Sequence, residues 1–471
     1  MFNDNKQNTP HKDNNRIIYF TIALIIILVG HTLLRGMYEY PVQVYILALA
    51  WLILFLPFLK RYAIIKNNIE VIHLIKIAFL INIILFFHYD MIEEATFGKI
   101  AFSDFFHFKF LAILFFIFYY VKFEVRWSPL KKIIKHIYKY KFIYLLTIAF
   151  ILRLGVMAYS TGPWIDVYWA IGGGAESLMQ GENPYSAEFL NPYPKEACLE
   201  IYNDADCKND KYAYMPATLI FSVLFRFLFS DPRVILMYCF FGMSLIIYSI
   251  VKNGNRENKE MAEILALFVL YLPLNLLVME KTWVEPLSLL FFYLAIYLYI
   301  YNFKYLPYIA FGISLATKQT MFAFVPFLLF LKDINIKKII VSTVTVLIFV
   351  IPFLLWNFWD FVSDVFLHQL QMNDALHSIS FMTISKIHFN YIIPPTVYLP
   401  ILLALFCFLM YQINKNRDIV TIIHSITLFL FALFLIKRGF VNYYYLIQGL
   451  LILLVSLEVR LIKIDPSQTN T

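Results

Sequence analysis

Charged residues are scarce in this sequence. Its 471 residues include 31 acidic and 39 basic side chains, together 15%, whereas 61% of the residues are hydrophobic. The mean hydropathy is correspondingly high, at +0.70. A soluble globular protein carries about 25% charged residues, so this chain has too little polar surface for a water-soluble fold. The composition predicts a protein embedded in a lipid bilayer.

Stretches of about ten residues with alternating polarity, which are typical of membrane β-strands, are also missing. Apolar runs of roughly 17 to 22 residues recur instead, and this length crosses a hydrocarbon core of ~30 Å. We therefore predict an all-α fold, a polytopic bundle of about 14 transmembrane helices with both chain ends in the cytoplasm. The expected spans are 16–36, 43–59, 70–88, 108–121, 142–160, 233–251, 261–279, 284–303, 305–317, 320–331, 338–356, 395–413, 418–436 and 440–458.

The formal net charge is +8, which in a soluble protein would suggest a nucleic acid partner. Here the basic residues fall in short connections between apolar runs, where Lys and Arg mark the cytoplasmic side. We expect no nucleic acid partner. We expect a multi-pass protein of a bacterial or archaeal cytoplasmic membrane, surrounded by membrane lipids, with its long polar loop facing outward.

The expected helices form two blocks. The predicted parts are an N-terminal four-helix block without an assigned role (1–123), a basic cytoplasmic linker (124–141), a larger membrane domain (142–460) and a cytoplasmic tail (461–471). Residues 161–232 are expected to form an extracytoplasmic loop within the larger domain. In this loop, the run 216–229 is short, begins at a proline and contains Arg226, so we expect it to lie on the membrane surface; the alternative is a span.

Cysteine is rare, with four residues in the chain. Cys239 and Cys407 lie in apolar runs and are expected to be inert, whereas Cys198 and Cys207 share the polar loop. In an extracytoplasmic loop these two could form a disulfide; free thiols are the alternative. Because His, Cys and acidic residues do not recur at metal-ligand spacing, we expect no metal and no cofactor.

The connections expected on the outer side hold the candidate functional residues. Asp166 follows a span by a few residues and stands between Trp164 and Trp169. These aromatic residues fit an interfacial belt, but a partly desolvated carboxylate among them could also act as a general base toward a hydroxyl group.

Further ionisable residues lie at the outer ends of other expected spans. Lys281 and Glu285 flank one outer turn, and an unpaired charge at the position of Glu285 would be costly. Lys318 is at the tip of a short hairpin, and Arg438 precedes Asn442 at the start of the last span. Cations at membrane depth suit a lipid phosphate, and aromatic faces suit sugar rings, so the residues themselves point to a lipid-phosphate sugar.

These residues also fall in motifs that resemble a family. A span with Arg153, then Asp166, then G-x-N-P-Y (181–185) and Y-x-Y-x-P (212–216) is similar to the GT-C superfamily of membrane glycosyltransferases, nearest to glycosyltransferase family 87, the polyprenol-phosphate mannosyltransferase type. That family usually has Y-P-P where this chain has Y-M-P. The T-K-Q at 317–319 and the V-N-Y-Y-Y at 441–445 are similar to later elements of related enzymes.

The resemblance, which covers about 142–450, implies an inverting transfer of mannose or another hexose. The donor would be a polyprenyl-phosphate sugar, and the acceptor a hydroxyl of a lipid, glycan or protein on the outer face. Asp166 would be the general base. The expected substrate-binding residues are Glu285, Lys318, Gln319, Arg438, Tyr185, Tyr214, Lys281 and Asn442. Members that use monophosphate donors generally need no metal.

Three other functions are open at this point. A polymerase or ligase that transfers glycans from a pyrophosphate lipid would be expected to carry an arginine-rich late outer loop, but 357–394 contains Lys386 as its one basic residue apart from histidine. A transporter, for instance of lipid-linked sugars, would be expected to have ionisable residues within its spans and paired broken helices. A non-catalytic scaffold is the third.

Overall fold

The structure is a computed structural model that describes residues 15–32, 40–59, 68–88, 103–125, 127–193, 195–196, 198, 211–254, 259–368 and 378–462. The elements in these ranges are nineteen α-helices and three short 3-10 or π-helical segments, without a strand. The prediction of an all-α fold is therefore confirmed. Eight of the described helices are long and apolar enough to cross a membrane, which supports a membrane protein; the total of about 14 spans stays a prediction.

The elements match many of the expected spans to within a few residues. In chain order they are α1 (Asn15–Thr32), α2 (Pro41–Leu59), α3 (Asn68–His88), α4 (Ser103–Ile117), α5 (Ser128–Tyr159), α6 (Asp166–Met179), η1 (Pro184–Ser186), α8 (Pro216–Phe229), α9 (Val234–Gly254), α10 (Lys259–Leu270), α11 (Asn275–Glu280), α12 (Glu285–Ile300), α13 (Leu306–Leu315), η3 (Gln319–Phe324), α14 (Val325–Leu328), α15 (Ile336–Trp356), α16 (Phe358–Val362), η4 (Ser363–Leu367), α18 (Phe381–Phe389), α19 (Pro395–Lys415), α20 (Ile419–Ile436) and α21 (Val441–Val459).

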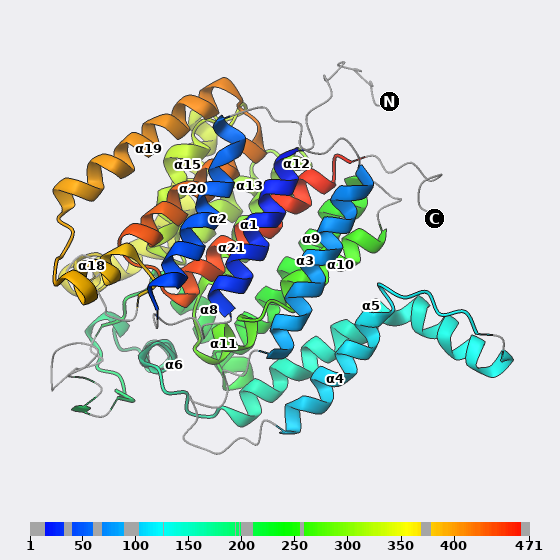
Figure 1. Cartoon of the computed structure of the whole chain (residues 1–471). Helices are drawn as coiled ribbons and strands as arrows, with labels where there is room; N and C mark the ends of the chain where they lie inside the picture. The colour runs from blue at the N-terminus through cyan, green and yellow to red at the C-terminus, as the bar shows by residue number, and fades with distance from the viewer. Residues whose placement is uncertain are drawn as a thin grey trace.

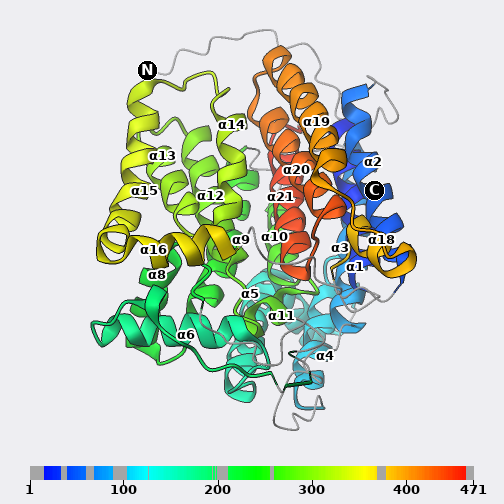
Figure 2. The same ribbon diagram turned by 90° about the vertical axis from the view of Figure 1, so that its left-hand side faces the viewer.

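The most buried of the eight long helices, α20 and α21, form the centre of the bundle (Figure 1). Figure 2 shows α12, α13 and α15 on one side of α21, with α1–α3 on the other. Because α21 packs on every side, its apolar residues face protein all round, whereas α15 and α19 at the edge leave most of their surface exposed. This pattern is expected when lipid, and not water, covers the outer helices.

Several helices start or end together at one end of the bundle, which we call the basic end. Arg16 at the start of α1 pairs with Glu458 near the end of α21, with Nε and Oε1 3.3 Å apart, and also donates to the hydroxyl of Thr421 at the start of α20. Arg460 lies 5.3 Å from the ring of Tyr301, just after α12. The starts of α1 and α20 and the ends of α12 and α21 therefore share this end.

The span expected over 261–279 is broken into α10 and α11 at Pro273. Proline has no N–H group, so the carbonyl of Val269 lacks its helical donor, and the turn frees the next carbonyls as well. Side chains take their place: Asn275 donates to Val269 O, Arg153 to Leu270 O at 2.7 Å and Asn82 to Tyr271 O at 2.8 Å. Arg153 thus caps a broken helix, because backbone groups away from water must be paired inside the protein.

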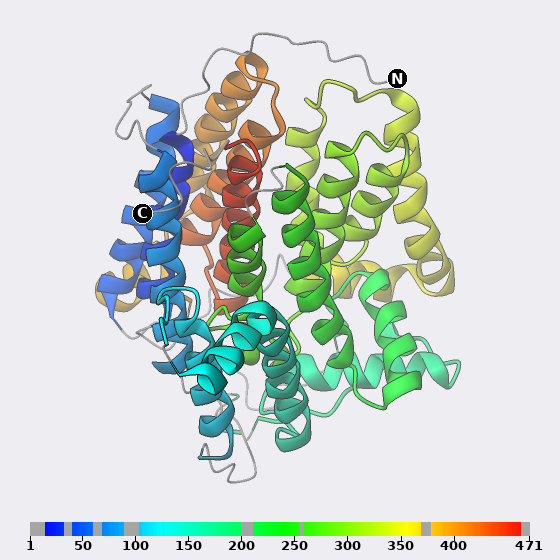
Figure 3. The same ribbon diagram turned by 90° about the vertical axis from the view of Figure 1, so that its right-hand side faces the viewer.

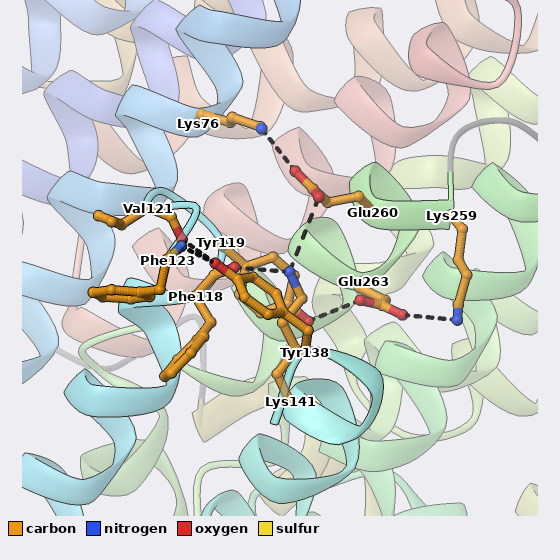
Figure 4. A network of polar contacts seen from close by, with 10 residues as sticks. All are labelled: Lys76, Phe118, Tyr119, Val121, Phe123, Tyr138, Lys141, Lys259, Glu260 and Glu263. Atoms are coloured by element: carbon orange, nitrogen blue, oxygen red, sulfur yellow. Dashed lines mark hydrogen bonds and ion pairs between the residues drawn. The ribbon is translucent and has the colours of Figure 1, made fainter. Parts of the chain in front are cut away.

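The first helices are fixed to the rest of the bundle, as Figure 3 shows for α3–α5 beside α10. In the polar cluster of Figure 4, Nζ of Lys76 on α3 lies 2.7 Å from Oε1 of Glu260 on α10. The Tyr119 hydroxyl, just after α4, donates to Glu263 at 2.9 Å. Lys141 on α5 lies 3.6 Å from the centre of the Tyr119 ring. These contacts join residues 1–123 and 142–460 through their membrane helices.

The linker expected at 124–141 is mostly helical, because α5 already begins at Ser128 with Pro129 in its first turn, a position that suits proline. Figure 1 shows this part of α5 projecting away from the bundle.

Helix α8 matches the run 216–229 in length, and at 14 residues it is shorter than the eight long helices. It packs on α6, where Arg226 and Glu176 form an ion pair at 2.9 Å; the expected position on the membrane surface stays a prediction.

Candidate functional site

Helix α6 begins at Asp166, the first candidate residue. The preceding Ile165 is extended, and the Oδ1 atom of Asp166 accepts a hydrogen bond from the N–H of Val167 at 2.8 Å. The hydroxyl of Tyr193 donates to the same oxygen at 3.3 Å. A carboxylate in the first turn of a helix is stabilised by the helix dipole. Asp166 is half-buried, so its carboxylate is held in place yet keeps contact with solvent.

The G-E-N-P-Y motif forms a tight turn after α6. Gly181 takes a left-handed φ of 80°, as residues that end helices often do. The side chain of Asn183 accepts from the N–H of Tyr185 at 3.1 Å, and Pro184 opens η1. Tyr185 is 2% exposed, and its hydroxyl donates to the carbonyl of Tyr214 at 3.0 Å. The motif therefore holds Tyr185 against the Y-A-Y segment (212–214). Tyr185 supports this segment and is too buried to offer a surface to a ligand.

The Y-A-Y segment (212–214) is fixed at each of its three residues. Besides the bond from Tyr185 to Tyr214, the N–H of Tyr212 donates to Oδ2 of Asp364 at 3.0 Å. The amide of Gln319 donates to Ala213 O at 3.0 Å and to Val365 O at 2.8 Å. Three elements distant in sequence, η1, η3 and η4, thus meet on three residues and hold the backbone that carries the Tyr214 side chain.

The same segment meets the T-K-Q motif at the break between α13 and η3. The N–H of Ala217 donates to Ala316 O at 2.9 Å, and the hydroxyl of Thr218 donates to Thr317 O at 2.8 Å. The first turn of α8 therefore satisfies the carbonyls that the break leaves free, as backbone away from water requires. Lys318 lies at this junction in extended conformation.

A buried ion pair lies next to the junction. Lys318, 8% exposed, donates to Oε1 of Glu285, which is 1% exposed at the start of α12. The side chain amide of Asn442, at the start of α21, donates to the same oxygen at 2.7 Å. Nζ of Lys318 also lies 5.0 Å from the ring centre of Tyr443. Among the described residues, Oε2 of Glu285 has no hydrogen-bond partner although it is buried.

Tyr214 connects Asp166 with this ion pair electrostatically. Burial raises the pKa of Tyr214 well above its ordinary value, and the carboxylates of Asp166 and Glu285 raise it further. Both carboxylates therefore act on the Tyr214 hydroxyl through their negative charge. We call Asp166, Tyr214, Glu285, Lys318 and Asn442 the carboxylate site. Figure 2 places its helices α6 and α8, and the starts of α12 and α21, at the end of the bundle opposite the basic end.

Two further candidates, Arg438 and Lys281, lie at this end with other neighbours. Arg438 is half-buried, with its guanidinium 4.9 Å from the ring of Phe440. Lys281 follows α11, where burial lowers its pKa while neighbouring Glu280 acts in the opposite direction.

Cys198 is disulfide-bonded, and Cys239 and Cys407 are free. Cys207, its expected partner, lies outside the described residues, so this pairing stays a prediction.

Two residues that support the site, Asp364 and Tyr193, were not predicted from the sequence. Asp364 is 0% exposed in the π-helical turn η4, where its carboxylate binds the N–H of Tyr212 and lies 3.2 Å from Nζ of Lys211. Tyr193 binds Asp166. The only signal for Asp364 is an acidic residue inside an apolar stretch, which needs a partner when it is buried. Tyr193 lies in a loop without a pattern that would indicate its contact.

Comparisons of the chain with protein-family models, with curated proteins and with solved structures gave no match. The function must therefore be argued from the chemistry of the carboxylate site.

Proposed function

We propose that the protein is a membrane glycosyltransferase of the GT-C type that transfers a sugar, mannose or another hexose, from a polyprenyl phosphate to an acceptor hydroxyl. The observation that carries the proposal is the junction of T-K-Q with Y-A-Y. At this junction Lys318 pairs with Glu285, and the carboxylates of Glu285 and Asp166 both raise the pKa of Tyr214. The Asp166 carboxylate and the Lys318 ammonium lie at the same end of the bundle. A base and a cation suit a reaction in which a hydroxyl loses a proton and a lipid phosphate leaves.

In the proposed reaction, Asp166 accepts the proton of the acceptor hydroxyl while its oxygen bonds to the anomeric carbon of the sugar. The bond from that carbon to the phosphate oxygen breaks on the opposite side, so the configuration inverts. The polyprenyl phosphate leaves with the bonding electron pair, and the ammonium of Lys318 stabilises the added negative charge. The half-buried position of Asp166 lets a carboxylate meet a substrate without full exposure to water.

Glu285 is better suited to positioning than to direct contact with a sugar. It is almost fully buried and its Oε1 atom already accepts from Lys318 and Asn442. Glu285 therefore holds both donors, and Asn442 and Lys318 remain the groups that can reach a ligand. The Tyr214 hydroxyl stays protonated because of its raised pKa and can donate a hydrogen bond. Tyr185 and Gln319 hold the segment that carries Tyr214, and Arg438 and Lys281 are assigned to the outer part of the phosphate site.

A transporter is the main competing function, because the bundle contains two broken helices, at α10–α11 and at α13–η3. In transporters, carbonyls freed by such breaks bind ions. Here the freed carbonyls accept from Asn82, Arg153 and Asn275 at the first break. Ala217 and Thr218 donate to those of the second. Because protein donors occupy both sets, the breaks do not favour ion coupling.

The proposal is tested by transfer from radiolabelled polyprenyl-phosphate sugars, supplied as a panel of hexoses, with the purified full-length protein and a membrane extract as acceptor. Labelled product that depends on the protein is expected from at least one donor. If no monophosphate donor is used but a pyrophosphate-linked glycan is, the protein is a polymerase or ligase. Substrate movement across vesicles without product would indicate a transporter.

A further inference from the structure

A second site lies between α12, α13, α14 and α15, away from the carboxylate site. It is a cavity of about 380 Å³ whose wall is almost entirely apolar. Phe292, Ile296 and Phe311 line one side, and Val346 lines another. Figure 2 shows these four helices as neighbours at the edge of the bundle, where α15 faces the surroundings. A hydrocarbon chain would fill such a space.

Two hydroxyl groups in the cavity wall lack partners. Tyr308 is 6% exposed and Ser342 is 9% exposed, and both line the cavity. Within the described part of the chain, neither hydroxyl oxygen has a hydrogen-bond partner. Burying a hydroxyl without a partner is costly. Two such groups in one cavity therefore point to a ligand with hydrogen-bond acceptors at this level.

The lining changes in a regular order along α15. Lys338, Ser342 and Val346 are spaced by four residues, so they lie on one face of the helix, roughly 6 Å apart along its axis. All three line the cavity. From the start of the helix, the cavity therefore presents a cation, then a hydroxyl, then an apolar wall. A glycerophospholipid has its groups in the same order: an anionic phosphate, ester carbonyls that accept hydrogen bonds, and an acyl chain.

The entrance at Lys338 is positively charged and lies at the basic end. Lys338 is half-buried with its Nζ 5.2 Å from the Tyr308 ring. Exposed Lys304 and Lys332 lie in the adjoining connections together with one acidic residue, Asp333, and exposed Lys337 is in the first turn of α15. This excess of positive charge favours an anionic head group, since basic residues near a membrane surface attract anionic lipids.

We propose that this cavity binds one acyl chain of an anionic glycerophospholipid from the leaflet at the basic end. The phosphate contacts Lys338, an ester carbonyl accepts from Tyr308 or Ser342, and the chain fills the apolar part. An isoprenoid chain entering from the carboxylate site would leave both hydroxyls unpaired, because it has no ester group. The proposal does not depend on the function proposed above, because it concerns binding alone.

The test uses the purified full-length protein in nanodiscs with a phosphatidylglycerol that carries a photoactivatable diazirine in one acyl chain. After illumination, the labelled peptides are identified by mass spectrometry. Labelling of the cavity residues is expected, and unlabelled phosphatidylglycerol should compete better than phosphatidylcholine. Lys338→Gln should weaken that competition about fivefold, the equivalent of about 1 kcal/mol, whereas the exposed control Lys337→Gln should change it less.

The second part of the test fills the cavity with a larger side chain. Val346→Trp should remove most of the cavity labelling, whereas Ile348→Trp, which is on the exposed face of the same helix, should leave it unchanged. If Val346→Trp does not give monodisperse protein, the double variant Tyr308→Phe, Ser342→Ala removes both hydroxyls with little change in volume and should weaken phosphatidylglycerol binding about tenfold or more. Labelling that survives both changes, or equal competition by phosphatidylcholine, overturns the proposal. So does a photoactivatable polyprenyl phosphate that labels the cavity in preference to phosphatidylglycerol.

Discussion

Lys318 donates a hydrogen bond to Oε1 of Glu285, and the resulting ion pair joins the break after α13 to the first turn of α12. Neither residue is more than 8% exposed. A buried charge is tolerated when it has a partner, and losing one partner costs much more than losing both. The position of the Lys318 ammonium in the carboxylate site therefore depends on Glu285.

We predict that Lys318→Met lowers the free energy of unfolding by about 3 to 5 kcal/mol, because it leaves the Glu285 carboxylate buried without its cation. The double variant Lys318→Met, Glu285→Gln should recover most of this loss while transfer stays low. Unfolding in detergent measures the first effect and sugar transfer the second. Lys304→Met, at an exposed lysine of the basic end, is the control. Equal stability of the single and double variants would contradict a buried pair.

Tyr214→Phe tests the hydroxyl whose pKa is raised by Asp166 and Glu285. We expect transfer to fall about tenfold to a hundredfold, since a hydrogen bond to a charged group contributes about 1.5 to 3 kcal/mol. Tyr185→Phe, the matched control, should reduce stability by about 1 kcal/mol with a smaller effect on transfer. If the two variants transfer sugar equally well, the Tyr214 hydroxyl has no direct role.

The same variant also has a pH signature. The folded protein keeps the Tyr214 proton above the ordinary tyrosine pKa of about 10, because the folded pKa is raised. The folded state then binds more protons than the unfolded state, so wild type should lose stability relative to Tyr214→Phe as the pH rises through that range. Unfolding curves of both proteins between about pH 9 and pH 11 measure the difference. A constant difference would contradict the raised pKa.

Gln319→Leu tests the support of the Y-A-Y segment. The substitution removes the two hydrogen bonds to Ala213 and Val365 and should cost about 2 kcal/mol, since each is worth about 1 kcal/mol. Amide exchange at 212–214 should become faster. Gln412→Leu, on peripheral α19, is the control and should leave exchange at 212–214 unchanged. Unchanged exchange in Gln319→Leu would mean that the other contacts hold the segment alone.

Much of this fold could be predicted from the lengths of the apolar runs. Because a span needs about 20 apolar residues, the expected limits 233–251 and 440–458 lie within a few residues of α9 and α21. The break at Pro273 was missed, although a proline inside the run and polar Asn82 and Arg153 in other spans were its signals. The helical structure of residues 128–141 in the expected linker was not predicted, because its lysines were interpreted as a charge signal, and lysine is also a good helix former.

The candidate site could be predicted in its residues but not in its pairings. Asp166, Glu285, Lys318 and Asn442 were found because polar residues at the ends of spans are few. Their contacts depend on helix packing, since Asn442 and Glu285 are 157 positions apart, and no sequence pattern gives that packing. For the same reason the sequence did not indicate that Glu285, expected to bind the substrate, is buried and accepts a hydrogen bond from Lys318; its role in positioning Lys318 is our proposal.

The orientation of the bundle can be measured by cysteine labelling in cells. Glu188 and Lys252 are both exposed and are expected on opposite sides of the membrane. We predict that a membrane-impermeant maleimide labels Glu188→Cys in intact cells and Lys252→Cys only after permeabilisation, in a Cys407→Ser background. The basic end is then cytoplasmic, as positive charge near spans indicates. The reverse labelling would place the carboxylate site in the cytoplasm and exclude an outer-face reaction.

The most direct test of the proposed function is sugar transfer by wild type and Asp166→Asn, with Glu188→Gln as a control at an exposed carboxylate of the same loop. Losing a general base should lower transfer by about two to four orders of magnitude. The amide keeps the size of the side chain and can still accept from Val167 and Tyr193, so folding should be preserved. The account predicts transfer by wild type and Glu188→Gln that collapses in folded Asp166→Asn. Transfer at the wild-type rate by Asp166→Asn would contradict it.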